Sequence, residues 1–303
     1  MALYAFDGTW NTDQPNAEKM TNVIKFRDAY AEAVFYREGV GTRFGPFGRL
    51  IGGITGAGGR ERIEEGLEAL SENFQKGDTT IDIIGFSRGA ALAVHFANQI
   101  AKGVKGLAVG LPIRFLGIWD IVASFDLPGN TIDLGWDLGM PANVQNCFHA
   151  MALDEKRVLF PLSRLSAQDV SSVNPPVAEV WFRGVHSDVG GGDPDLALSS
   201  IALNWMFRNA IRCGLVIRPE RVTANLAIMD PTSDISHHRF EVAHLFHDIH
   251  RKVRAMDVVH FSVQNHEGSQ FNNPAASLAR MNEDGTLTAV EVAAAVAAGG
   301  AGV

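Results

Sequence analysis

The sequence has 303 residues, 46% of them hydrophobic, which is enough for one large core or at most two domains. Its 26 basic and 34 acidic side chains give a formal charge of −8 without a dense basic stripe, which argues against nucleic-acid binding. No apolar run approaches the roughly 20 residues of a membrane helix, and no secretory signal pattern precedes the first apolar run. We therefore expect a cytoplasmic protein without stable membrane insertion, with delivery by a secretion machine left open and the oligomeric state unspecified.

The first two-thirds of the chain alternates short apolar runs with helical patterns, which is typical of a mainly parallel sheet flanked by helices. The expected strands, in chain order, cover residues 3–6, 33–36, 80–84, 113–118 and 178–182. The expected helices cover residues 61–74, 88–102, 146–156 and 198–212, the last with Gly214 as its C-cap. The pattern as a whole predicts the α/β class.

Two stretches read as irregular, and the end of the chain is weakly patterned. Residues 41–59 are rich in glycine, and residues 126–143 are rich in glycine, proline and aspartate. We expect the second stretch to contribute to a loop-built cap over a site. From about residue 220 the periodicity weakens, so we predict one domain over 1–303 with a core over about 1–215 and a helical or irregular extension over 216–303.

The strongest chemical signal is the G-x-S-x-G motif Gly85-Phe86-Ser87-Arg88-Gly89, which lies between an apolar run and a helical pattern. This strand–turn–helix context is typical of a nucleophile elbow and predicts Ser87 as the nucleophile. Gly85 and Gly89 would let the strained turn pass close to the sheet and the helix. The N–H of Arg88, at the start of that helix, is the expected first oxyanion donor.

A serine needs a base and an orienting acid, which follow it in the chain order Ser, Asp or Glu, His in this type of fold. Asp120 ends the apolar run 114–120 and is the expected acid. His186 ends the run 180–186, opens a glycine-rich loop and is the expected base. Asp126 and Asp188 stay open as alternative acids, and His260 stays open as an alternative base.

The remaining histidines predict no metal site. His149 is expected to pack within its helix. Five histidines at spacings of three or four could hold a metal on a helix: His237, His238, His244, His247 and His250. Because no matching cysteines or H-E-x-x-H motif accompany them, we interpret this stretch as a solvated helix. The two cysteines, Cys147 and Cys213, predict buried thiols rather than a disulfide framework.

The motif Asp7-Gly8-Thr9-Trp10 follows the first expected strand. Gly8 would allow close approach, and the N–H of Thr9 or Trp10 could be the second oxyanion donor. An aspartate after a strand followed by Gly-Thr also suits a phosphate-handling loop, in which Asp7 would act with a divalent metal. A third interpretation is an aspartate that hydrogen-bonds its own turn.

Four segments together resemble a known family: Asp7 to Asn11, Gly85 to Ala90, Phe115 to Asp120 and Gly184 to Gly192. They are similar to the α/β-hydrolase domain family that includes the catalytic domain of type VI secretion phospholipase effectors, over residues 1 to about 215. The resemblance implies an α/β-hydrolase fold with Ser87, Asp120 and His186 as the triad.

We therefore predict a serine hydrolase that cleaves a carboxylic ester, either of a phospholipid or of a soluble molecule, through an acyl-enzyme. Water releases the acyl group, so the mechanism requires no cofactor. Two alternatives stay open. One is a metal-dependent phosphoryl-handling enzyme that uses Asp7, and the other is a catalytically idle binding module on a hydrolase scaffold.

Overall fold

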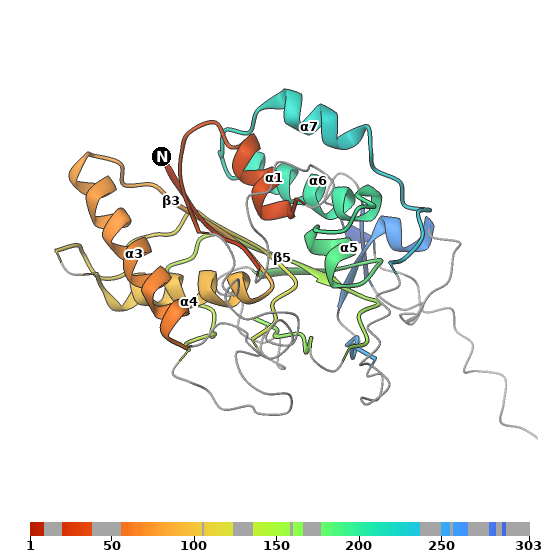
Figure 1. The fold of residues 1–303 in the computed structure, drawn as a ribbon, viewed down its shortest axis with the longest axis horizontal. Helices are drawn as coiled ribbons and strands as arrows, with labels where there is room; N and C mark the ends of the chain where they lie inside the picture. Colours follow the sequence, from red (N-terminus) through yellow and green to blue (C-terminus); the bar gives the residue numbers. More distant parts are fainter. Residues whose placement is uncertain are drawn as a thin grey trace, which may run out of the picture.

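The computed structural model describes residues 1–8, 20–37, 56–104, 106–123, 136–157, 160–165, 177–236, 250–254, 257–265, 279–282 and 287–288. These residues form a nine-stranded sheet in the order β2-β1-β3-β4-β5-β6-β7-β8-β9, with helices on both faces (Figure 1). The mainly parallel sheet flanked by helices confirms the predicted fold class. Residues 124–135 of the expected loop-built cap, and most of the glycine-rich stretch 41–59, lie outside the described residues.

The strands are parallel from β2 to β8, and only β9 runs antiparallel, against β8. Their bounds are β1 Ala2–Phe6, β2 Ala33–Arg37, β3 Ile81–Phe86, β4 Phe115–Trp119, β5 Cys147–Ala152, β6 Val177–Phe182, β7 Val258–His260, β8 Ala279–Met281 and β9 Leu287–Thr288. Because neighbouring strands are parallel, the residues that follow β3, β4 and β6 emerge at one edge of the sheet, where ligands bind in open α/β folds.

The helices divide between the two faces of the sheet. They are α1 Asn22–Ala29, α3 Gly56–Gln75, α4 Arg88–Lys102, α5 His186–Gly190, α6 Ala197–Arg212 and α7 Pro219–Leu226. Helices α3 and α4 cover one face, α1, α5 and α6 cover the other, and α7 lies outside α6 (Figure 1). A short 3-10 helix, Phe261–Asn265, follows β7.

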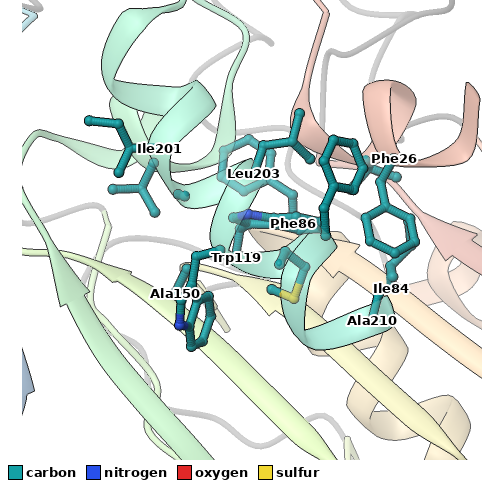
Figure 2. Close-up of a cluster of buried hydrophobic side chains, with 14 of the residues drawn as sticks. Phe26, Ile84, Phe86, Trp119, Ala150, Ile201, Leu203 and Ala210 are labelled. Atoms are coloured by element: carbon teal, nitrogen blue, oxygen red, sulfur yellow. The ribbon is translucent and has the colours of Figure 1, made fainter. Parts of the chain in front are cut away.

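Both faces of the central strands are buried, and successive side chains alternate between two hydrophobic clusters. On β1, Tyr4 packs against Phe96 of α4, with ring centroids 5.2 Å apart. Leu3 instead joins the cluster beneath α1 and α6, where the ring centroids of Phe26 and Phe207 lie 5.5 Å apart. Figure 2 shows part of this cluster, with Phe26 of α1 beside Leu203 and Ala210 of α6. Parallel strands buried on both faces are nearly continuous apolar runs, which is why these strands could be recognised in the sequence.

Most expected elements are present with small shifts at their ends. The five expected strands correspond to β1, β2, β3, β4 and β6, and the expected helix over 88–102 coincides with α4. Gly214 follows the end of α6 with a φ of 83°, as a C-cap glycine requires. Residues 61–74 and 198–212 lie within α3 and α6.

The expected helix over 146–156 is wrong, because residues 147–152 form strand β5 in the interior of the sheet. β5 pairs in parallel with β4 and with β6, and five of its six side chains are buried. A short apolar run that is buried on both faces has no alternation, so periodicity alone cannot distinguish a strand from a buried helix. The pairing of two flanking strands decides between them.

Several short elements were not expected from the sequence. Helix α1 and helix α7 have eight residues each, and α5 has five. Beyond residue 215, where a helical or irregular extension was expected, β7, β8 and β9 continue the sheet. These strands belong to the same sheet as the core. The single domain over 1–303 stays a prediction.

We expect Gly89→Ala to lower the free energy of unfolding by about 3 kcal/mol, because the protein backbone leaves no room for a side chain there. A Cβ atom at Gly89 would lie 2.3 Å from the carbonyl oxygen of Phe6 and 2.5 Å from that of Asp7. Urea unfolding measures the loss. Gly139→Ala is the matched control, since the nearest atom to its Cβ would be 3.5 Å away; equal losses in the two variants would contradict the steric explanation.

Candidate active site

Ser87 occupies a strained turn between β3 and α4. Its φ is 59° and its ψ is −126°, in a region that non-glycine residues rarely adopt. A Cβ atom at Gly85 would lie 2.7 Å from the carbonyl oxygen of Gly89, so the turn needs glycine at this position. The Ser87 N–H donates to the carbonyl oxygen of Trp119 over 3.0 Å, which anchors the turn to the end of β4.

Asp120 follows β4 and is fully buried beside this turn. Its φ of 42° is the second positive value for a non-glycine residue in the described part of the chain. Its N–H donates to the Ala150 carbonyl over 2.8 Å, and its Oδ1 accepts the N–H of Ala152 over 2.8 Å. Two bonds to the neighbouring strand β5 thus hold the backbone and the carboxylate of Asp120.

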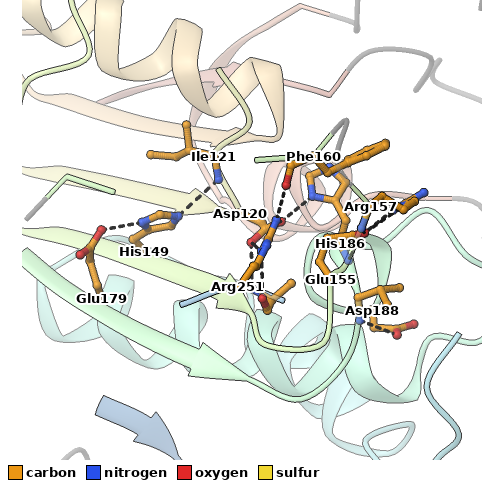
Figure 3. Close-up of polar contacts among 12 residues, drawn as sticks. Asp120, Ile121, His149, Glu155, Arg157, Phe160, Glu179, His186, Asp188 and Arg251 are labelled. Atoms are coloured by element: carbon orange, nitrogen blue, oxygen red, sulfur yellow. Dashed lines mark hydrogen bonds and ion pairs between the residues drawn. The ribbon is translucent and has the colours of Figure 1, made fainter. Parts of the chain in front are cut away.

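His186 meets Asp120 from a distant part of the chain. Its Nδ1 lies 2.6 Å from Asp120 Oδ2 (Figure 3). The centroid of its ring lies 4.6 Å from that of Phe86 and 5.0 Å from that of Phe160. The expected glycine-rich loop is wrong here, because His186 begins the short helix α5. The imidazole therefore packs against the residue that precedes Ser87, and a helical turn holds its backbone.

The electrostatics favour a neutral His186 with its proton on Nδ1. Burial lowers the pKa of His186, and this effect outweighs the opposing influence of Asp120 and Glu155. Because ionised Asp120 only accepts hydrogen bonds, the Nδ1–H points to it and Nε2 keeps a free lone pair. In the described part of the chain, His186 is hydrogen-bonded to Asp120 and Glu155 and not to Ser87. The hydrogen bond between a catalytic base and its serine is often long in enzymes without substrate.

Arg251 is a site residue that sequence reasoning missed. Its Nη1 lies 2.5 Å from Asp120 Oδ1 and its Nη2 lies 2.9 Å from Asp120 Oδ2 (Figure 3). Burial would raise the pKa of Asp120, but the charge of Arg251 and the hydrogen bond with His186 hold it below its usual range. No local motif marks Arg251, which lies in the weakly patterned last third of the chain.

Glu155 and Arg157, which the sequence did not indicate either, lie on the other side of the His186 imidazole. Glu155 is buried and accepts the backbone N–H of His186 over 3.1 Å and two hydrogen bonds from the guanidinium of Arg157, over 2.8 Å and 2.6 Å. Burial would raise the pKa of Glu155, but Arg157 lowers it to about 2. The Arg157 guanidinium also covers the ring of Phe160 at 3.8 Å. The charged Glu155 therefore fixes the start of α5.

The alternative acid Asp188 is engaged elsewhere. Its Oδ2 accepts the N–H of Val185 over 2.9 Å and the N–H of Ser236 over 3.0 Å, so it caps α5. Burial raises the pKa of Asp188. Asp126, the other alternative acid, lies outside the described residues.

The alternative base His260 contacts Ser262 and Phe182. Its Nδ1 lies 2.8 Å from Ser262 Oγ, and its ring stacks on Phe182 at 4.6 Å. Burial lowers the pKa of His260 to about 3, with Arg208 as a further cause. These contacts describe a neutral core histidine.

The expectation that His149 packs within a helix is wrong, because His149 belongs to strand β5. Its Nδ1 lies 3.0 Å from Glu179 Oε1, and its Nε2 accepts the N–H of Ile121 over 3.3 Å (Figure 3). His149 is fully buried between these two partners. It therefore supports the backbone turn that immediately follows Asp120.

Asp7 hydrogen-bonds its own turn, as one of the three interpretations expected. Its Oδ1 accepts the N–H of Gly8 over 2.7 Å, and its Oδ2 accepts the hydroxyls of Thr21 and Tyr36 over 2.8 Å and 3.1 Å. Both carboxylate oxygens thus accept hydrogen bonds within the fold. Thr9 and Trp10, the expected second oxyanion donors, lie outside the described residues.

Arg88 begins α4, so its N–H has no acceptor within the helix. Burial lowers the pKa of its side chain to about 10.

In the part of the chain that the structure describes, no group of three His, Cys, Asp or Glu side chains could hold a metal ion. His250 is exposed, and His237, His238, His244 and His247 lie outside the described residues. None of the helices described is long and apolar enough to cross a membrane.

The choice between the two histidines can be tested directly. We expect His260→Gln to change kcat/KM for an ester by less than about tenfold, and His186→Gln to lower it by about 10⁴-fold or more. The reason is that His186 contacts Asp120 and the Ser87 turn, whereas His260 contacts Ser262 and Phe182. Initial rates with p-nitrophenyl butyrate measure both. The reverse order of the two effects would make His260 the base.

Comparison with protein families identifies the relatives of the chain. The model of the family described as "T6SS, Phospholipase effector Tle1-like, catalytic domain" matches residues 3–108 and 104–209, more than half of the chain. The chain belongs to this family. Membership supports a lipolytic, ester-hydrolysing activity, and the matched residues include Ser87, Asp120 and His186.

The similarity to individual proteins is low in sequence identity or covers only part of the chain. A crystal structure of an uncharacterized protein from Pseudomonas aeruginosa is 21% identical with a TM-score of 0.55, and the match covers 76% of this chain and 49% of that one. The Tle1 effector bound to the VgrG spike of the type VI secretion system is 22% identical with a TM-score of 0.43, over 63% and 51% of the two chains. An uncharacterized protein from Saccharomyces cerevisiae is 38% identical over 69 residues, 20% of this chain and 10% of that protein. The chain thus spans about half or less of each of these relatives.

Proposed function

We propose that the chain is a serine hydrolase that cleaves the carboxylic ester bonds of a phospholipid through a covalent acyl-enzyme. The observation that carries the proposal is the hydrogen-bonded pair of Asp120 and His186, packed against the turn that holds Ser87. Family membership supports the lipid class of the substrate. It also supports delivery by a type VI secretion system, which the expectation of a cytoplasmic protein left open.

In the proposed reaction, Ser87 Oγ attacks the acyl carbonyl while His186 Nε2 takes its proton. Asp120 accepts the Nδ1–H and stabilises the imidazolium that forms. The N–H of Arg88, together with an N–H from Thr9 or Trp10, would donate to the oxyanion; loss of one such donor typically costs about 10²- to 10³-fold in kcat. His186 then returns the proton to the leaving alcohol, and water releases the acyl group by the reverse steps.

The test combines a covalent probe with a substrate series. Wild-type protein and Ser87→Ala are treated with a fluorophosphonate probe and assayed with p-nitrophenyl esters of increasing chain length and with phosphatidylcholine vesicles. We expect probe labelling, ester hydrolysis and fatty-acid release by the wild type only. Hydrolysis that EDTA abolishes and the probe leaves untouched would favour the phosphoryl-handling alternative, and no turnover above that of Ser87→Ala would favour an idle binding module.

A further inference from the structure

Arg251 binds Asp120, the expected catalytic acid, from a position 131 residues further along the chain. Its two terminal nitrogens contact both oxygens of Asp120, at 2.5 Å and 2.9 Å. The same nitrogens donate to the carbonyl oxygens of Ala152 and Phe160, over 2.8 Å and 3.0 Å. The Arg251 side chain is 6% exposed and that of Asp120 is 0% exposed, so the pair is shielded from water. A planar guanidinium with four fixed contacts holds a carboxylate in one orientation.

Every acceptor position of Asp120 is occupied. Oδ1 receives the N–H of Ala152 and Nη1 of Arg251, whereas Oδ2 receives Nδ1 of His186 and Nη2 of Arg251. A carboxylate has about four such positions. The permanent cation of Arg251 and the imidazole of His186 therefore share one negative charge. The two hydrogen bonds to Oδ2 come from these two different side chains (Figure 3).

We propose that Arg251 is a positioning residue of the hydrolase site, which fixes the orientation of Asp120 and neutralises part of its charge, so that His186 stays an active base at lower pH. This inference rests on the proposed function, since it gives Asp120 and His186 their roles in that reaction. The hydrogen bonds described above join Arg251 to Asp120 and to the carbonyl oxygens of Ala152 and Phe160, so its proposed effect on the reaction passes through Asp120.

The physical reason is the charge that faces the imidazole. Asp120 and Glu155 both favour the imidazolium, whereas burial and the cation of Arg157 disfavour it. The cation of Arg251 cancels part of the field of Asp120 at His186, because opposite charges a few ångströms apart largely offset each other at longer distance. Without Arg251 the full carboxylate charge would act on the ring and raise the pKa of His186. Since only neutral His186 can accept the serine proton, the acid limb of activity would then move to higher pH.

The experiment measures the rate of fluorophosphonate labelling of Ser87 against pH, together with kcat/KM for p-nitrophenyl butyrate. We expect Arg251→Gln to move the acid limb of both profiles upward by about one pH unit, so that labelling well below the limb falls about tenfold further than at the plateau. Arg251→Lys keeps the positive charge and loses the bidentate contact with the two oxygens of Asp120. It should keep the acid limb near that of the wild type with a reduced plateau.

Arg114→Gln is the matched control, because Arg114 holds buried Asp82 with two contacts, at 2.9 Å and 2.5 Å, away from His186. It should lower stability without moving the limb. If the acid limb of Arg251→Gln stays at the pH of the wild-type limb, the proposal is overturned. If Arg251→Gln does not fold, the wild-type profile decides, and an acid limb of the wild type above pH 7 overturns the proposal. Failure of the proposed function is distinguishable, since the wild type would then show neither labelling nor a pH profile.

Discussion

Replacement of Ser87 by alanine is expected to lower kcat for ester hydrolysis by about 10⁴- to 10⁶-fold with little change in stability. The loss follows from removal of the attacking oxygen, while the buried environment of the site stays in place. Stability should be preserved because the Ser87 side chain makes no capping hydrogen bond to helix α4. Stopped-time assays with p-nitrophenyl butyrate measure kcat, and thermal unfolding measures stability.

Ser71→Ala provides a control for this variant, since Ser71 lies within α3, on the face of the sheet opposite to α5, which carries His186. It should hydrolyse the ester at the wild-type rate. If Ser87→Ala retained more than about one-tenth of the wild-type kcat, a group other than this hydroxyl would be the nucleophile. The hydrolase proposal would then have to be rebuilt around another side chain.

Asp120→Asn is expected to lower kcat by about 10⁴-fold and also the free energy of unfolding by about 3–5 kcal/mol. Activity falls because an amide can donate to His186 and favour the wrong tautomer. Stability falls because the amide cannot match the guanidinium of Arg251, which stays buried beside Ala152 without its counter-charge. Activity and urea unfolding measured on the same preparation separate the two effects.

Asp82→Asn is the matched control for Asp120→Asn. Asp82 is buried and accepts two contacts from Arg114 and the hydroxyl of Tyr30 over 3.0 Å, so it loses an equivalent ion pair. We expect a comparable loss of stability with kcat within about tenfold of the wild type. If the two variants lost kcat to the same extent, the effect of Asp120 would be structural rather than catalytic.

The order of strands explains why three distant residues could be selected from the sequence. Ser87, Asp120 and His186 each follow a buried apolar run, and the runs pair as neighbouring or near strands of a parallel sheet. Since such strands end at one edge, a residue just beyond each run is placed near the others by topology alone. The predicted meeting of Asp120 and His186 depends on this geometry, and their hydrogen bond is present.

The amino-acid sequence by itself determined the α/β class, the strands with clear apolar runs and the turn between β3 and α4, because these depend on local periodicity and on glycines with strict steric limits. Only the tertiary structure decided that residues 147–152 form a strand, since both flanking strands are needed to distinguish it from a buried helix. It also brought Arg251 to Asp120 and gave Glu155 its hydrogen bond with the backbone of His186. Contacts between side chains far apart in the chain leave no periodic signal, so three-dimensional packing alone establishes them.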